Sequence, residues 1–197
     1  MRRTTVFTAS LATALLCPSA TLIAQSPRPE AVELVGQIPR VRSENPDIAE
    51  QIADATRQSP FFRALVAEID ASNGIVYVVA GQCRHGGAAC FMMRVTKAAS
   101  NRILQIRVDP RFADCDVDLI ASIGHELWHV LEILRNPKLD NDDAIFHFYA
   151  REGRHSNRAT FPFGGWETTG ALEAGYQVLR ELRAAGIASR GCKGARR

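Results

Sequence analysis

The sequence predicts an α+β domain, in which helices at both ends enclose a small antiparallel sheet. Two patterns support this fold class. Three runs rich in β-branched residues follow one another between residues 75 and 108. The stretch 116–134 is apolar on nearly every side, which is typical of a helix in the middle of a core. The 197 residues, 46% of them apolar, suffice for one compact domain with its own core.

The N-terminus has the order of a signal peptide. Arg2 and Arg3 precede an uncharged apolar stretch that is too short to cross a bilayer. The predicted division of the chain is a signal peptide over 1–24, an irregular, proline-containing leader over 25–46 and a domain over 47–197. We therefore expect an exported protein, periplasmic or extracellular. After residue 24 no run of 18 uncharged apolar residues occurs, so we expect no stable membrane span once the signal is cleaved.

The charge balance of the mature chain points to no polyanionic partner. Residues 1–24 contain two arginines and no acidic residue, so 22 of the 24 basic residues remain against 21 acidic ones. The formal net charge thus falls from +3 to +1. A protein that binds nucleic acid by electrostatics normally carries a clear basic excess. We expect no nucleic-acid partner.

Capping and turn residues divide the domain into helices and strands. Asp47 can cap the first helix, the pair Ser59-Pro60 ends it and begins a second, and Asn73-Gly74 forms a turn. The predicted helices cover 47–58, 60–71, 116–134, 140–152 and 168–185, and the predicted strands cover 75–80, 90–96 and 102–108. Three consecutive strands favour an antiparallel meander.

Four cysteines remain after the signal peptide, which are Cys83, Cys90, Cys115 and Cys192. An even number in an oxidising compartment favours two disulfide bonds. Cys83 and Cys90 bracket a glycine-rich loop between two predicted strands, so we expect this pair, which leaves Cys115 with Cys192. Four cysteines allow three pairings, and the sequence leaves the other two open.

The buried helix contains the segment His125-Glu126-Leu127-Trp128-His129. Histidines four residues apart lie one turn apart on one face, so both imidazoles can bind a single Zn²⁺. The glutamate beside the first histidine can then serve as the general base that activates a water molecule. Two histidines and a carboxylate are costly in an apolar helix unless something satisfies them. This cost favours a metal site over ordinary core histidines.

The segment from Ile123 to Leu131 resembles the active-site helix of the zincin metallopeptidases, the small gluzincins above all. The resemblance is firm over this segment, and the preceding strands and following helices agree with it only in order. It implies a zincin-like domain with a Zn²⁺ cofactor, in which His125 and His129 are zinc ligands and Glu126 is the base. It also implies a third ligand, a glutamate from a later helix.

Two glutamates follow at a suitable distance, Glu167 and Glu173. On the predicted final helix Glu173 points away from the apolar face. Glu167 lies at the border of that face, in line with the small residues Gly170, Ala171 and Ala174. A stripe of small residues would let two helices approach closely, so we expect Glu167 to be the third ligand and Glu173 to be the alternative.

One position departs from the gluzincin pattern. These enzymes commonly carry an aspartate three or four residues after the ligand glutamate, where it orients a zinc histidine. Gly170 and Ala171 stand at those places here. Glu132 lies one turn beyond His129 on the same face, so we expect it to orient a ligand histidine or to pair with Arg135. Direct binding of the metal by Glu132 is a further alternative.

The expected function is zinc-dependent hydrolysis of peptide bonds in a peptide or protein substrate. The alternative is a non-catalytic zincin-like domain that binds or scaffolds and keeps the metal. The mature chain would have 173 residues, 197 less 24, which leaves little room for substrate subsites. Candidates for stabilising an oxyanion are His147, Tyr149, His155 and Tyr176.

Overall fold

The structure is a computed structural model that describes residues 38–83, 87–155 and 166–186, without the side chain of His155. The chain divides into two compact units, 1–37 and 38–197, and every described residue belongs to the second. The predicted signal peptide, most of the predicted leader and Cys192 therefore lie outside the described residues.

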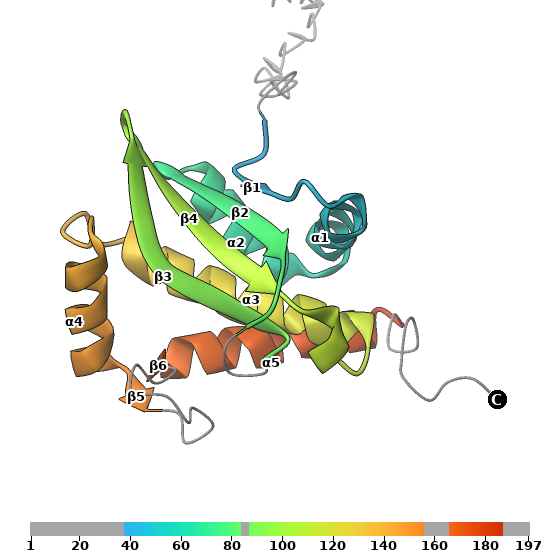
Figure 1. The fold of residues 1–197 in the computed structure, drawn as a ribbon. Helices are drawn as coiled ribbons and strands as arrows, with labels where there is room; N and C mark the ends of the chain where they lie inside the picture. Colours follow the sequence, from blue (N-terminus) through green and yellow to red (C-terminus); the bar gives the residue numbers. More distant parts are fainter. Residues whose placement is uncertain (1–37, 84–86, 156–165, 187–197) are drawn as a thin grey trace, which may run out of the picture. The chain divides into compact units, whose positions relative to one another are not determined.

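The described elements confirm the α+β class and most of the predicted boundaries. In chain order they are β1 (Val41–Arg42), α1 (Pro46–Gln58), α2 (Pro60–Asp70), β2 (Gly74–Ala80), β3 (Ala89–Ala98), β4 (Asn101–Val108), a 3₁₀ turn (Pro110–Phe112), α3 (Asp116–Leu134), α4 (Asp142–Glu152), β5 (Arg154–His155), β6 (Trp166–Glu167) and α5 (Thr169–Ala184). Five α-helices and a mixed four-stranded sheet thus make up the main body of the described chain (Figure 1).

The predicted antiparallel meander is wrong, because the sheet has the order β1-β2-β4-β3. Strand β2 is parallel to both of its neighbours, and only β3 and β4 are antiparallel. Residues 81–88 connect β2 to β3. A strand position is about 4.8 Å wide, so a connection of this length can step over one position, whereas a two-residue turn would force β2 and β3 to be neighbours.

The predicted irregular leader contains a short strand in its described part. Val41 is buried and pairs with Val76, so β1 extends the sheet on the far side of β2. Helix α1 begins at Pro46, and its cap is Asn45, whose side chain accepts hydrogen bonds from the next two available backbone N–H groups. Asp47 therefore lies in the first turn of the helix, where its charge suits the helix dipole, and is not the cap.

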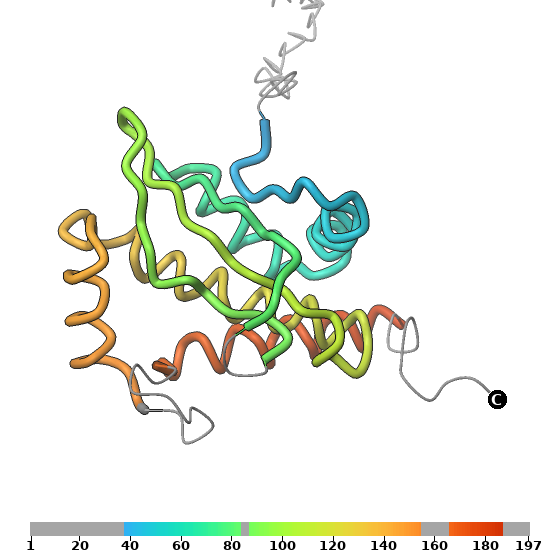
Figure 2. Tube along the Cα trace, in the orientation of Figure 1, coloured from blue at the N-terminus to red at the C-terminus, as the bar shows by residue number. Residues whose placement is uncertain are grey.

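One face of the sheet packs on helices. Along β4, Leu104, Ile106 and Val108 are fully buried, while the residues between them are partly exposed. Helices α2 and α3 contact the strands, and α5 contacts both α2 and α3. Figures 1 and 2 show α5 running along α3. Helix α3 thus has the sheet, α2 and α5 around it, which explains why it is apolar on nearly every side.

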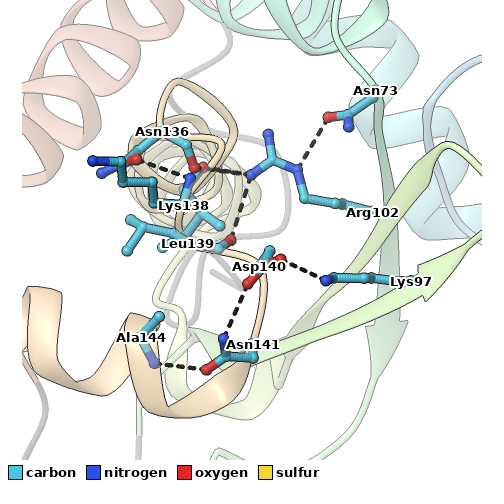
Figure 3. A network of polar contacts seen from close by, with 10 residues as sticks. Asn73, Lys97, Arg102, Asn136, Lys138, Leu139, Asp140, Asn141 and Ala144 are labelled. Atoms are coloured by element: carbon cyan, nitrogen blue, oxygen red, sulfur yellow. Dashed lines mark hydrogen bonds and ion pairs between the residues drawn. The ribbon is translucent and has the colours of Figure 1, made fainter.

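Arg102 joins strand β4 to the end of helix α3 (Figure 3). Its guanidinium is buried, and its Nε donates to Asn73 Oδ1 at 3.1 Å. Its other nitrogens donate to the backbone carbonyls of Ile133, Leu134, Asn136 and Leu139, at 2.9, 2.6, 3.1 and 3.4 Å. The last carbonyls of a helix have no partner inside the helix, so this arginine satisfies them and fixes the end of α3 against the sheet.

Cys83 and Cys90 are joined by a disulfide bond, with their Cα atoms 5.9 Å apart. This is the pair that the loop between β2 and β3 favours, and such a bond is compatible with an exported protein. The pairing of Cys115 with Cys192 stays a prediction, since Cys192 lies outside the described residues. Within the described ranges, no helix combines the length and the apolar character that a membrane span requires.

Candidate metal centre

Helix α3 presents His125 and His129 on one face. Their ring centroids lie 5.0 Å apart, and the two side chains are 15% and 6% exposed. The helix begins with Asp116 and Asp118, whose charges stabilise its N-terminal end, and it ends at the carbonyls that Arg102 holds. A helix secured at both ends keeps the two imidazoles in a fixed relation to each other.

Glu167 completes a group of three possible ligands. Its Oε2 lies 2.9 Å from His125 Nε2. One ligand atom from each of His125, His129 and Glu167 can be chosen so that all three lie within 4.8 Å of one another. Donors bound to one tetrahedral zinc ion at about 2.0–2.2 Å lie roughly 3.5 Å apart, so small side-chain shifts would bring all three onto one ion. Two histidines and a carboxylate are a donor set that suits zinc.

The sequence predicts Glu167 at the border of the apolar face of the final helix. In the structure, a small two-stranded sheet positions this residue instead. Glu167 in β6 pairs with Arg154 in β5, and α5 begins two residues later, after the cap residue Thr168. The Thr168 hydroxyl accepts a hydrogen bond from Ala171 N and so ends the strand and starts the helix. Glu167 thus reaches the histidines from an extended segment just before the helix.

Small residues let α5 approach α3 closely, as the sequence predicts. A Cβ added at Gly170 would lie 2.4 Å from Trp128 Nε1, and one at Gly175 would lie 3.3 Å from His125 Cβ. Ala171 and Ala174 are buried at the same contact. Larger side chains at these places would push the segment that carries Glu167 away from the histidines.

Glu173 is exposed on α5 and lies outside the group of three, as its helical position predicts. The apolar face of α5 includes the buried residues Val178 and Leu182, whereas Leu172 is 44% exposed. Of the two later glutamates, Glu167 is therefore the one that lies beside the histidines.

Glu126 faces the edge strand of the sheet. Its Oε2 accepts a hydrogen bond of 2.8 Å from the backbone N–H of Phe91 in β3. The register of β3 against β4 shifts between Phe91 and Val95, so this part of the strand departs from regular pairing. A carboxylate has two oxygens, and this bond uses one of them. Oε1 is then the oxygen on which Glu126 can accept a proton.

Glu132 contacts His129, whereas Arg135 pairs with Glu68 at 2.7 Å. One Glu132 oxygen, Oε2, lies 2.9 Å from His129 Nδ1 and 3.1 Å from the Tyr149 hydroxyl. The other, Oε1, accepts hydrogen bonds from Trp128 Nε1 at 3.1 Å and from Thr168 Oγ1 at 2.7 Å. Since Nδ1 is engaged, Nε2 is the nitrogen of His129 that remains for a metal. The sequence predicts three alternative roles for Glu132, which are orienting a histidine, pairing with Arg135 and binding the metal. These contacts fit the first role.

Three carboxylates around two imidazoles make the site favourable for positive charge. Burial lowers the pKa of His125, but the hydrogen bond to Glu167 and the charges of Glu126, Glu167 and Glu132 outweigh it, so that the pKa is raised. Burial likewise opposes ionisation of Glu132, but hydrogen bonds from His129 and Thr168 outweigh it and lower its pKa. The carboxylates around His125 thus favour a positive charge at this place.

Of the predicted oxyanion residues whose side chains are described, Tyr149 is buried and His147 and Tyr176 are exposed. Tyr149 is 1% exposed, and its hydroxyl lies 3.1 Å from His129 O and from Glu132 Oε2, inside the protein. Burial, followed by the charge of Glu132, raises the pKa of Tyr149. Tyr176 is 70% exposed, and His147 is exposed and packs against Phe146. The side chain of His155 lies outside the described atoms. Tyr149 thus contacts Glu132 through a partly buried hydrogen bond.

Sequence reasoning missed the roles of Thr168 and Trp128, which both donate to Glu132. Thr168 is recognisable from the sequence as a helix cap, but its bond to a residue 36 positions earlier depends on the packing of α5 on α3. Comparisons with protein-family models, curated proteins and solved structures found no match for the chain. The grouping of these side chains is therefore what bears on function.

Proposed function

We propose that this protein is a zinc-dependent hydrolase of peptide bonds. The observation that carries the proposal is that ligand atoms of His125, His129 and Glu167 lie within 4.8 Å of one another. Glu126 follows His125 on the same helix, and its charge acts on that imidazole. Two histidines and one glutamate are the ligands of one class of catalytic zinc sites, in which the fourth position is open to water or substrate. The segments that supply these side chains are 38 residues apart, counted from His129 to Glu167, so their meeting is not a consequence of local sequence.

In this proposal, metal binding and proton transfer belong to different residues. His125, His129 and Glu167 would hold the ion, which when bound supplies the Lewis acidity that activates water and polarises a carbonyl group. Glu126 would take a proton from the attacking water on its Oε1 and deliver it to the leaving amine. The Phe91 N–H holds the other oxygen of Glu126 during this transfer.

A peptide suits this site better than a compact small molecule. Strand β3 is an edge strand of the four-stranded sheet, and Phe91 in this strand contacts Glu126 directly. Extended peptides bind to exposed sheet edges through backbone hydrogen bonds. A substrate aligned along β3 would present its peptide bonds to Glu126 and the histidines.

Metal analysis tests the proposal most directly. We expect the purified protein to contain about one zinc ion per chain, and the double variant His125→Ala/His129→Ala to contain none. Cleavage of a broad peptide library should stop when a chelator removes the metal and return when zinc is added. Stoichiometric zinc in the double variant would contradict the assignment of the ligands.

The alternative is a binding or scaffold domain that keeps the metal without turnover. One observation favours it. Two backbone N–H groups of β3, those of Phe91 and Val95, already donate to the carboxylates of Glu126 and Asp142. A peptide that paired with this edge would have to replace those bonds. Zinc binding without cleavage across the library, after a search for an activating step, would support this alternative.

A further inference from the structure

Glu132 contacts four polar groups, those of Trp128, His129, Tyr149 and Thr168. Its two oxygens contact polar groups from α3, α4 and the cap residue of α5. We propose that Glu132 is a positioning residue that holds two of the three ligands at once, His129 directly and Glu167 through Thr168. This inference rests on the proposed metal centre and adds the residue that assembles it.

The contact with Glu132 fixes the tautomer of His129. An ionised carboxylate can only accept hydrogen bonds, so the 2.9 Å contact with Glu132 Oε2 requires a proton on Nδ1. A neutral imidazole with its proton on Nδ1 has its lone pair on Nε2. The Tyr149 ring stands edge-on to this imidazole with the centroids 5.2 Å apart, which restricts its rotation. Glu132 thus sets both the ring orientation and the nitrogen that can bind a metal.

Glu132 also holds the residue next to Glu167. Its neighbour Thr168 is buried, donates to Glu132 Oε1 at 2.7 Å and accepts from Ala171 N at 3.2 Å. The same Oε1 accepts from Trp128 Nε1, and the indole lies so close to Gly170 that a side chain there would collide with it. The junction between β6 and α5 is therefore fastened to α3 one residue away from Glu167.

Among the described residues, Glu132 is the carboxylate that contacts the ring of His129. The family pattern would place an aspartate at Gly170 or Ala171, and neither residue can accept a hydrogen bond from a histidine through its side chain. Glu132 comes from the metal helix itself, one turn beyond the histidine that it orients. It supplies the missing carboxylate from the opposite side of the helix contact.

The test uses the full chain with Glu132→Gln. The amide oxygen should keep the place of Oε1, because Thr168 and Trp128 both donate there, so the amide nitrogen should face His129 Nδ1. That nitrogen donates, and the histidine proton should therefore move to Nε2. We expect the affinity for zinc, measured by competition with a chelator, to fall about 10- to 100-fold. Glu173→Gln, on the exposed face of α5, is the matched control and should keep the affinity.

A second measurement does not need the metal. Nitrogen NMR of the imidazole rings in the metal-free protein, at a pH where they are neutral, should show the proton of His129 on Nδ1 in the wild type and on Nε2 in Glu132→Gln. Loss of thermal stability with an unchanged tautomer and unchanged zinc affinity would overturn the inference and leave Glu132 a structural residue.

The pair Thr168→Ser and Thr168→Val covers the case in which Glu132→Gln fails to fold. The serine variant keeps the hydroxyl and should bind zinc like the wild type, and the valine variant should bind more weakly. Equal zinc affinity in the two variants would contradict the link to Glu167. If the wild type binds no zinc, the proposed function fails, while the tautomer of His129 still decides whether Glu132 orients it.

Discussion

The charges of Glu126 and Glu167 both act on His125, but the two carboxylates have different neighbours. Glu167 approaches His125 Nε2 at 2.9 Å, the nitrogen that faces the site. Glu126 turns toward the sheet and accepts a hydrogen bond from Phe91 N. A carboxylate close to imidazole nitrogens suits the proposed metal site, whereas one held at the edge strand suits the proposed proton transfer to a substrate there.

We expect Glu126→Gln to bind zinc with little change and to lose nearly all hydrolysis. An amide has the shape of the carboxylate and keeps the contact with Phe91, but it cannot accept a proton from water. Loss of a general base typically costs about 10²- to 10⁴-fold in rate. Zinc content and the cleavage rate of a peptide, measured on the same preparation, check this. Loss of zinc in this variant would show that Glu126 is a ligand.

Glu167→Ala should weaken zinc binding and hydrolysis together, because it removes one of the three proposed ligands. Glu173→Ala, six residues later and exposed, is the control and should change neither. Chelator competition and the cleavage rate measure the two effects. Weaker zinc binding in Glu173→Ala, with Glu167→Ala unaffected, would reverse the assignment of the third ligand.

At the scale of single residues, the sequence predicts the site because its central segment is local. His125, Glu126 and His129 are recognisable from their spacing on one helix, and Glu132 follows one turn later. Glu167 was predictable as the better of two glutamates, although the reason lies partly in the β5–β6 pairing that no local pattern indicates. The bond from Thr168 to Glu132 was missed because it crosses the contact between α5 and α3, whereas the bond from Trp128 lies within α3 and its four-residue spacing could have indicated it.

At the scale of elements, helix α3 depends on an arginine in the sheet. Arg102 in β4 donates to four carbonyls at and beyond the end of α3. A planar guanidinium with several donors can serve such a cluster, and an ammonium group cannot reach the same set. The position of α3 relative to the sheet is thereby set at the end that lies beyond His129.

We expect Arg102→Met to lower the free energy of unfolding by about 2–3 kcal/mol, because buried carbonyls lose charged donors. Arg102→Lys should recover only part of the loss. Arg151→Met is the control and should stay within about 0.5 kcal/mol, since Arg151 is exposed and pairs with its neighbour Glu152 in a surface contact. Urea denaturation of the three variants measures these differences. An equal effect of Arg102→Met and Arg151→Met would contradict the anchoring role.

At the scale of the whole described body, Glu181 ties the last helix to an early one. This residue of α5 accepts hydrogen bonds from Ser59 Oγ at 2.6 Å and from Phe61 N at 2.9 Å, at the start of α2. The contact joins parts of the chain about 120 residues apart. Burial opposes ionisation of this carboxylate, but the bonds from Ser59 and Phe61 outweigh burial and lower its pKa.

A lowered pKa in the folded state gives the sign of a pH effect. The contribution of Glu181 is present above its ordinary pKa of 4.5 and is lost as the pH falls through the lower folded value. We expect Glu181→Gln to be about 1 kcal/mol less stable than the wild type near neutral pH, with the difference shrinking in acid. Urea denaturation over a pH series measures it, with Glu173→Gln as the control on the same helix. A difference that grows in acid would contradict the sign.

The sequence by itself determined the five helices, the three longer strands and the spacing of His125, Glu126 and His129 on one helix. Periodicity, caps and turns act within a few residues, so Asn45, Ser59 and Thr168 begin helices at or next to the predicted places. The apolar surroundings of α3 were predictable for the same reason, since a helix that is apolar all round must be enclosed.

Only the tertiary structure decided the order of the strands and the completion of the site. The position of β4 between β2 and β3 depends on which faces of the sheet the helices cover. The residues of a strand do not by themselves identify the strand that pairs with it. In the same way, Glu167 reaches His125 and Thr168 reaches Glu132 because α5 packs closely on α3. Contacts between distant segments follow from the packing of whole elements, and local sequence patterns do not specify that packing.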